Sequence, residues 1–210
     1  MKLKFSIILF IISIFNLNAQ NTTDAEKVIN QLIQSVRTTA IRTNFKIVVS
    51  EKNALNSQSV TGVFTLKGNK FMLDMENARV WFDGKTQWSY NASDNEVSIT
   101  EPGPDELAGI NPMVIIAGFK QKSVAKFSRL KSAVNYIIEL TPAQSKAEFK
   151  KVEVHINKSN GNLVMLKLTD KKALVTTLTL TNYQKVNNIT DKSFTFDKSK
   201  FKNVIINDLR

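Results

Sequence analysis

Apolar and polar residues alternate along most of the chain, as they do in β-strands that bury one face. The alternation begins at Phe45–Val49 and continues in about five short segments between Val60 and Glu101. It returns in the second half of the chain, in the segments 134–140, 152–156, 163–168 and 173–180. The tail 194–197 predicts a last short strand. The pattern predicts about eleven strands in a mainly antiparallel β protein, of class α+β once its helices are added.

Glycine-containing turns separate several of these strands. Asp83-Gly84, Gly68-Asn69 and Asn160-Gly161 each lie between two apolar segments. Glycine supplies the positive φ that tight hairpin turns need, so each pair predicts a β-hairpin. The sequence contains no repeat of fixed period and no linker-like stretch. We therefore expect residues 20–210 to form one domain.

Two helices accompany the predicted strands. Thr23 and Glu26 fit a capping box, in which a threonine N-cap is followed three residues later by glutamate. Apolar residues then recur at helical spacing on one face: Ala25, Val28, Ile29, Leu32, Ile33 and Val36. A second, apolar helix is expected over about 105–119, with Gly118 or Lys120 at its end. A short apolar helix after an aromatic-rich sheet indicates a lid over that sheet.

The N-terminus predicts a secretory signal peptide over residues 1–19. A short basic start precedes the apolar run 5–15, and Ala19 offers a small residue for cleavage before Gln20. A membrane anchor is the alternative. We favour the signal peptide because the run is shorter than the roughly 20 apolar residues of a spanning helix.

The composition fits an exported protein. The chain has no cysteine, so it lacks disulfides, thiolate metal ligands and the lipidated cysteine that would tether an exported bacterial protein to a membrane. We expect a monomer free in the periplasm. The formal charge is +11, and +9 without Lys2 and Lys4. Because the lysines are scattered and the protein is exported, we interpret this charge as a solvated basic surface rather than a nucleic-acid site; attraction to anionic lipids or acidic partners is the alternative.

Groups for enzyme chemistry are scarce. His155, the single histidine, is out of phase with the apolar residues of its strand, and the sequence places no nucleophile beside it. The chain also lacks the several His or Cys ligands typical of zinc sites and any glycine-rich phosphate loop. We interpret Glu101, Asp105 and Glu106 as a solvated loop. We therefore expect no enzymatic activity, no cofactor and no metal; a hydrolase is the least favoured alternative.

The stretch 60–119 carries a pattern that a known family shares. It reads Gly62-Val63-Phe64-Thr65-Leu66-Lys67, then Lys70-Phe71, then Trp81–Asn91 with the motif D-G-K-T-x-W-x-Y-N, then Asn111-Pro112. In these residues, and in the order of its elements, the chain resembles the periplasmic outer-membrane lipoprotein carrier family, LolA. The motif is confined to this stretch, whereas the element order extends over most of the remaining chain.

The resemblance implies a half-open, unclosed β-barrel, with an N-terminal helix and a helical lid around an apolar cavity. It implies a soluble periplasmic chaperone without covalent chemistry, which takes acylated lipoproteins from an inner-membrane ABC transporter to an outer-membrane acceptor, either a receptor or the membrane itself. A sixteen-carbon chain exposed to water costs on the order of 12 kcal/mol, so a carrier must cover it. An envelope lipid- or glycolipid-binding or sensing module on the same fold is the alternative.

Large apolar side chains on a curved sheet either fill a continuous core or line a cavity. From the alternation and the resemblance together, we expect one side of the sheet and the lid to supply the lipid-binding residues. These are Phe45, Ile47, Phe64, Leu66, Phe71, Leu73, Met75, Trp88, Tyr90, Met113, Ile116 and Phe119.

The chain departs from the family at the first hairpin. Family members latch the lid with an arginine after this basic strand end, whereas the segment 66–70 here contains only lysines as basic residues. Lysine lacks the fork of donors that arginine presents. Lys67 and Lys70 are therefore the candidates for gating the lid, unless the lid opens in another way.

Overall fold

The computed structural model describes residues 23–50, 58–103, 106–107, 111–143 and 149–210. The predicted signal peptide and the expected start of the second helix at Asp105 lie outside these residues. Within the described part of the chain, no helix has the length and apolar character needed to cross a membrane.

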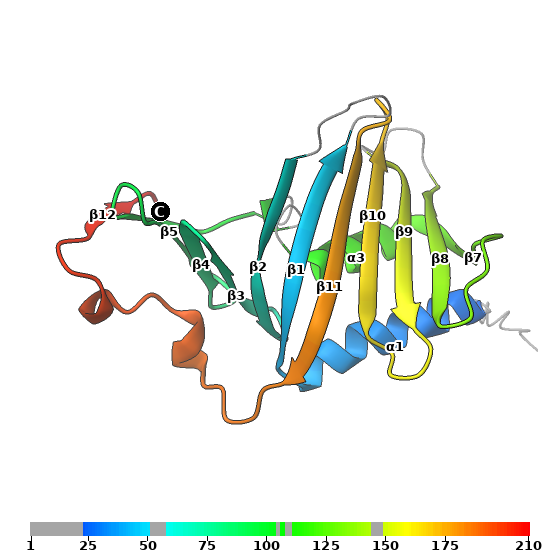
Figure 1. Ribbon diagram of the computed structural model, residues 1–210, viewed down its shortest axis with the longest axis horizontal. Helices are drawn as coiled ribbons and strands as arrows, with labels where there is room; N and C mark the ends of the chain where they lie inside the picture. Colours follow the sequence, from blue (N-terminus) through cyan, green and yellow to red (C-terminus); the bar gives the residue numbers. More distant parts are fainter. Residues whose placement is uncertain (1–22, 51–57, 104–105, 108–110, 144–148) are drawn as a thin grey trace, which may run out of the picture.

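The described residues form two α-helices, two short 3-10 helices and one twelve-stranded sheet (Figure 1). The helices are α1 (Asp24–Thr38), α3 (Pro112–Gln121), η1 (Asp191–Phe194) and η2 (Lys198–Lys200). The strands are β1 (Ile41–Ser50), β2 (Gln58–Lys67), β3 (Lys70–Met75), β4 (Ala78–Phe82), β5 (Gln87–Asn91), β6 (Glu96–Thr100), β7 (Ser123–Phe127), β8 (Asn135–Pro142), β9 (Phe149–Asn157), β10 (Leu163–Asp170), β11 (Val175–Lys185) and β12 (Ile205–Asp208).

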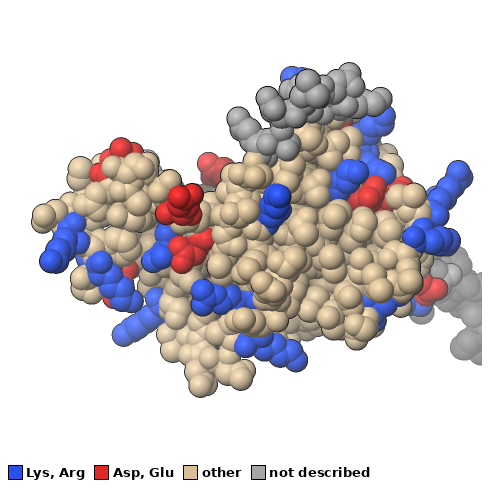
Figure 2. All heavy atoms as spheres, in the orientation of Figure 1, with Lys and Arg blue, Asp and Glu red and all other residues tan. Residues whose placement is uncertain are grey.

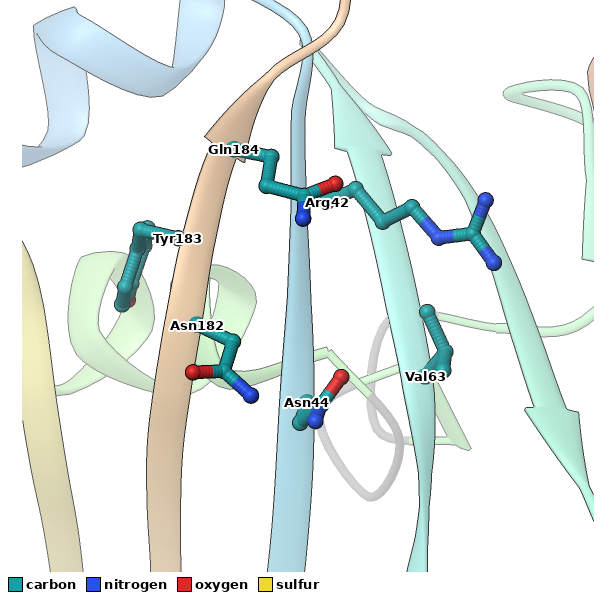
Figure 3. A pocket seen from close by; sticks show the side chains of 6 residues that line it. All are labelled: Arg42, Asn44, Val63, Asn182, Tyr183 and Gln184. Carbon is teal, nitrogen blue, oxygen red and sulfur yellow. The ribbon is translucent and has the colours of Figure 1, made fainter.

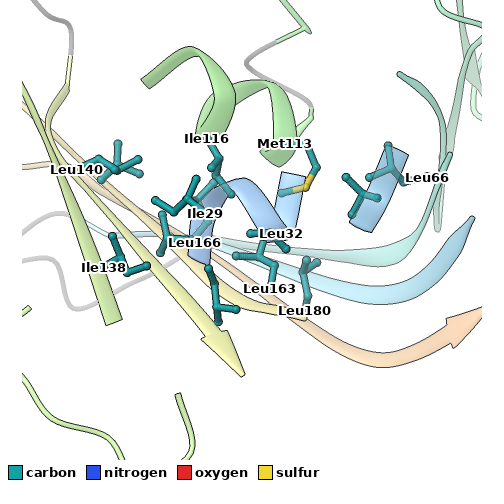
Figure 4. Close-up of a cluster of buried hydrophobic side chains, with 14 of the residues drawn as sticks. Ile29, Leu32, Leu66, Met113, Ile116, Ile138, Leu140, Leu163, Leu166 and Leu180 are labelled. Carbon is teal, nitrogen blue, oxygen red and sulfur yellow. The ribbon is translucent and has the colours of Figure 1, made fainter. Parts of the chain in front are cut away.

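The sheet is unclosed and almost entirely antiparallel. Its strand order is β12-β6-β5-β4-β3-β2-β1-β11-β10-β9-β8-β7, so β12 and β7 are its two edges. Of the described strands, only β12 runs parallel to its neighbour, β6. The sheet curves around α1 and α3, which lie on its concave face (Figures 1 and 4). The prediction of a half-open β-barrel with an N-terminal helix and a second short helix is confirmed.

The core lies between the concave face and the two helices (Figure 4). The α1 helix buries one face, formed by Ala25, Ile29, Leu32 and Val36. Cross-strand pairs meet this face, because directly opposed residues of an antiparallel pair point to the same side. Leu66 lies opposite Phe71, and Leu166 lies opposite Val154. The amphipathic helix predicted from its period therefore packs against both halves of the sheet.

The local signals in the sequence act as expected. The Thr23 hydroxyl accepts a hydrogen bond from the Glu26 amide at 3.2 Å, and the Glu26 carboxylate accepts one from the Thr23 amide at 2.9 Å, which completes the capping box. Gly68, Gly84 and Gly161 have φ of 62°, 104° and 72°, so each hairpin turn uses the left-handed freedom of glycine.

The α3 helix begins at a side-chain cap and ends later than expected. The Asn111 side chain accepts a hydrogen bond from the Met113 amide at 2.9 Å, and Pro112 occupies the first helical position. The helix continues through both Gly118 and Lys120 to Gln121, so the prediction that either residue ends it is wrong. Ten residues with apolar contacts on one side are enough to carry the helix past a single glycine.

The tail differs from its prediction. The segment 194–197 is not a strand: the fully buried Phe194 ends η1, and the last strand is β12. Phe196 and Phe201 instead pack against each other and against Trp81, with ring centroids 4.9–6.0 Å apart. The aromatic residues whose spacing predicts a strand at 194–197 lie instead in a segment that covers the convex face of the sheet.

Two glycine substitutions should change stability in opposite directions. A Cβ at Gly62 would lie 2.4 Å from the Asp74 carbonyl oxygen and 2.8 Å from the Phe45 ring, whereas one at Gly118 meets nothing within 4 Å. We expect Gly62→Ala to lower the free energy of unfolding by about 1–3 kcal/mol through overpacking. Gly118→Ala should raise it by about 0.5–1 kcal/mol, because alanine favours a helix interior. Urea denaturation of both variants measures the difference; equal effects would contradict this packing.

Candidate functional site

An apolar cavity of about 260 Å³ lies between the concave face of the sheet and the first turn of α3. It is lined by Phe45, Ile47, Val60, Phe64, Leu73, Met75, Pro112, Ile115, Leu166, Leu168, Thr176, Leu178 and Leu180. Apart from Thr176, all of these side chains are apolar. They come from β1, from two strands on each side of it and from α3, so the two halves of the sheet share the cavity.

The cavity has a buried floor and an exposed mouth. Phe45, Phe64 and Leu180 are buried. Ile47 and Leu178 lie two positions from Phe45 and Leu180, both toward the end of the sheet where β1 ends, and they are half-buried. Val60, opposite Ile47 in the register, is exposed. Exposure therefore rises along each strand toward the end of the sheet where β1 ends and β2 begins. The mouth lies at that end.

The register of β1 positions the walls. Phe45 lies opposite Gly62 on β2 and Leu180 on β11, and Ile47 lies opposite Val60 and Leu178. Because Gly62 has no side chain, the Phe45 ring lies over its Cα, within 3 Å of where a Cβ would be. Gly62 thus shapes the floor of the cavity.

Several residues predicted to bind lipid lie at the cavity, and others lie beside it. Phe45, Ile47, Phe64, Leu73 and Met75 line it. Leu66 and Met113 line a neighbouring cavity of about 30 Å³ that also touches α1. Phe71 and Ile116 are fully buried in the core, and the Phe119 ring packs 5.5 Å from Phe149.

Trp88 and Tyr90 lie on the convex face, away from the cavity. Phe82, part of the concave core, lies opposite Gln87, and side chains alternate along a strand. The prediction that Trp88 and Tyr90 share the side of Phe64 is therefore wrong. On that face Tyr90 packs against the C-terminal tail: its ring lies 4.6 Å from that of Phe201.

The two lysines proposed to gate the lid contact the segment that follows β11. The Lys67 ammonium donates to the Ile189 carbonyl at 3.3 Å, and the Lys70 ammonium lies 2.6 Å from the Asp191 carboxylate. The hydrogen bond from Lys70 lowers the pKa of Asp191 below its usual value. In the described part of the chain, the bonds of these lysines reach the segment after β11 rather than α3.

Sequence reasoning missed the wall that the second half of the chain supplies. The apolar alternation in 163–168 and 173–180 predicts strands there, but it does not show that these strands line the cavity. The residues missed are Val60, Pro112, Ile115, Leu166, Leu168, Thr176, Leu178 and Leu180. The apolar run of α3 has no polar face, so the sequence does not show which side of the helix faces the cavity. The prediction names Met113, Ile116 and Phe119, whereas Pro112 and Ile115 line the cavity.

A polar cluster lies on the opposite, convex face. The Glu153 carboxylate is 2.8 Å from the Lys151 ammonium and 3.1 Å from His155 Nε2. Burial works to raise the pKa of Glu153, but the hydrogen bonds from Lys151 and His155 outweigh it and lower that pKa. The Ser128 hydroxyl donates to Glu139 at 2.6 Å rather than to the histidine. The cluster is a network of hydrogen bonds and lysine–glutamate ion pairs without a serine–histidine pair. His155 lies on the face opposite Val154 and Ile156, in agreement with its phase along the strand.

Two further observations bear on the chemistry of this protein. Among the described residues, no group of His, Cys, Asp and Glu side chains is arranged to hold a metal ion. On the face shown in Figure 2, the basic side chains are scattered rather than gathered in one patch. The apolar cavity is therefore the feature of the described structure that most resembles a binding site.

A larger but shallower polar groove of about 630 Å³ lies on the convex side (Figure 3). Its lining residues come from the adjacent strands β2, β1 and β11, and include Arg42, Asn44, Asn182 and Gln184. It follows a bulge in the β1–β11 pairing, where Asn182 has a φ of 55°. Because three neighbouring strands form the whole groove, it is a surface depression and does not enclose a ligand.

Filling the cavity should block the binding of apolar molecules. We expect Leu178→Trp to weaken binding of the fluorescent probe N-phenyl-1-naphthylamine by about tenfold or more, a change of ~1.4 kcal/mol. Thr177→Trp is the matched control, because position 177 points to the convex face. Fluorescence titration measures both, and circular dichroism verifies the fold. Undiminished binding by Leu178→Trp would place the probe elsewhere.

One solved structure supports the fold, and two others are more distantly similar. An uncharacterised conserved protein from Thermus thermophilus matches with a TM-score of 0.57 and 11% identity, over 87% of this chain and 98% of that one. A LolA superfamily protein from Nitrosomonas europaea matches with a TM-score of 0.44 and 15% identity, over 82% and 98% of the two chains. A putative outer membrane lipoprotein-sorting protein domain from Vibrio parahaemolyticus gives 0.44 and 12%, over 82% and 97%.

Sequence comparison identifies the family. None of the proteins with curated functions is significantly similar to this chain. The family model described as outer membrane lipoprotein carrier protein LolA matches residues 13–172, which is more than half of the chain. The half-open sheet, the helix beside its apolar cavity and the D-G-K-T-x-W-x-Y-N hairpin all agree with that match. The chain belongs to the LolA family of outer membrane lipoprotein carrier proteins.

Proposed function

We propose that this protein is a soluble periplasmic chaperone that binds the acyl chains of lipoproteins in its apolar cavity and carries them from the inner to the outer membrane. The observation that carries the proposal is the cavity itself, with its buried floor, half-buried walls and open mouth. Family membership supports the class of ligand. The predicted signal peptide at residues 1–19 supports the periplasmic location.

The walls of the cavity suit an acyl chain because they offer dispersion contacts and almost no hydrogen-bonding groups. Ile47, Leu73, Met75 and Leu178 are half-buried without a ligand. A bound chain would remove both their surface and its own from water, at about 0.8 kcal/mol for each buried CH₂ group. Met75 adds an unbranched side chain that adapts to a flexible ligand.

Binding a long chain requires the cavity to widen. Its volume of about 260 Å³ is just below the range of roughly 300–1,000 Å³ that is common for ligand pockets. The first turn of α3 forms one wall through Pro112 and Ile115. We propose that α3 moves away from the sheet to admit the chain and returns to cover it.

Loading and release complete the proposed cycle. An inner-membrane lipoprotein-releasing ABC transporter would load the protein, and an outer-membrane receptor or the membrane itself would accept the lipoprotein. The cycle requires transfer of an apolar chain between sites and no covalent step. The cavity must not hold the chain too tightly, or release would fail.

Co-purification tests the proposed function. The protein is isolated from the periplasm beside an acylated lipoprotein, or beside the same lipoprotein with its acylated cysteine replaced. We expect only the acylated form to co-purify, with recovery preserved in Thr177→Trp and reduced about tenfold in Leu178→Trp.

Mass spectrometry of the bound molecules separates the alternatives. Recovery of phospholipid or glycolipid without lipoprotein would replace the carrier role with that of an envelope lipid-binding or sensing module. Recovery of neither, with the fold intact, would remove both proposals.

A further inference from the structure

Four apolar side chains are exposed together at the hairpin between β7 and β8. They are Phe127, Leu130, Val134 and Tyr136, and we call residues 127–136 the β7–β8 tip. Leu130 and Val134 are 63% and 62% exposed, and the rings of Phe127 and Tyr136 pack 5.7 Å apart. Exposed apolar residues that gather in one place mark an interaction surface, whereas single ones need no explanation.

The tip is held in shape by hydrogen bonds. The Leu130 amide donates to the Ser128 hydroxyl at 3.2 Å, and the Lys158 ammonium donates to the Ser132 carbonyl at 2.7 Å. The Lys158 amide donates to the Val134 carbonyl at 2.9 Å. Together these bonds pair one amide and two carbonyl groups of the turn with partners in the protein. The apolar side chains are thus presented outward by an ordered turn.

The charges around the tip are basic. Lys126, Arg129, Lys131 and Lys158 are exposed, and the Lys158 ammonium lies 5.6 Å from the centroid of the Tyr136 ring. Residues 123–138 contain no acidic side chain. Basic groups around exposed apolar and aromatic groups form the pattern by which peripheral proteins meet anionic membranes.

The acidic side chains nearby already have partners. Glu139, on β8, accepts the Ser128 hydroxyl at 2.6 Å and lies 3.6 Å from Lys151. At the start of α1, which reaches β7 through Thr23, Asp24 pairs with Lys27 and Glu26 closes the capping box. Lys126, Arg129 and Lys131 therefore remain available to an external anion, whereas the Lys158 ammonium already donates to carbonyl groups of the turn.

We propose that the β7–β8 tip docks this protein on a membrane surface rich in anionic headgroups, with its apolar side chains in the interface and its basic ones on the headgroups. A bilayer fits the tip better than a folded protein does, because four side chains cover far less than the roughly 800 Å² that a stable protein interface buries on each partner. The proposal deepens the proposed carrier function, since a carrier has to meet membranes, but docking requires no ligand in the cavity.

The position of the tip sets the orientation of the docked protein. The tip lies where β7 ends and β8 begins, and the antiparallel order from β8 to β1 places the cavity mouth at the other end of the strands. The mouth therefore points away from the docked surface. It stays open to the aqueous phase and to the periplasmic part of a transporter or receptor.

Vesicle co-sedimentation tests the docking. Protein purified from the periplasm is mixed with phosphatidylcholine vesicles that contain or lack phosphatidylglycerol. We expect binding only with phosphatidylglycerol, and weaker binding as salt rises. Leu130→Asp with Val134→Asp should reduce the bound fraction about tenfold, and Arg129→Gln with Lys131→Gln by a similar factor.

The matched control lies at the other edge of the sheet. Ile205→Asp with Leu209→Asp makes the same change of charge at side chains of comparable exposure, 55% and 67%, and should leave vesicle binding unchanged. Every tip variant should retain the circular dichroism spectrum and N-phenyl-1-naphthylamine binding of the wild type. Conversely, Leu178→Trp should keep vesicle binding and lose probe binding, so failure of the docking and failure of the carrier function are distinguishable.

Three results would overturn the docking proposal. The first is equal binding to both kinds of vesicle, and the second is equal loss of binding in the tip and control variants. The third is that the wild type does not bind vesicles but retains a periplasmic protein that the tip variants fail to retain. That result would assign the tip to a protein partner.

Discussion

The pairing of β1 with both β2 and β11 is the constraint on which the rest of the structure depends. In the described sheet, this strand joins the hairpins of the first half to those of the second, so its register sets the relation between the two walls of the cavity. Phe45 and Ile47 stand at the junction and touch both halves. Because side chains alternate with a period of two, a slip of one residue would turn both to the convex face and remove Phe45 from the floor of the cavity.

Core and cavity are parts of one apolar surface. The concave face is covered by α1 along part of its length and by the buried side of α3 along another part. Where neither helix covers it, the same kind of side chain remains half-buried. Burial under the helices contributes to stability, and half-buried residues of the same strands line the apolar cavity.

Local signals in the sequence predicted the elements well, and long-range packing decided what they missed. The capping box at Thr23, the glycine turns and the alternation of β2 to β6 depend on neighbours in sequence, and all of them form as expected. The side of the sheet that Tyr90 faces depends on the tail, because the Phe201 ring offers that side a partner. The cavity-facing side of α3 and the contribution of Leu178 depend on contacts between distant segments, which periodicity alone does not contain.

The β1–β11 pair also determines the order in which the protein can form. The strands β2 to β6 are joined by short turns, so each can pair with its neighbour soon after synthesis. Ile41 pairs with Lys185, and this contact closes a loop that contains most of the chain, at an entropic cost that grows with loop length. The two walls of the cavity meet only at that step. Until β11 has arrived, β1 exposes a free edge and an apolar face, so the stage before closure is the one most vulnerable to aggregation.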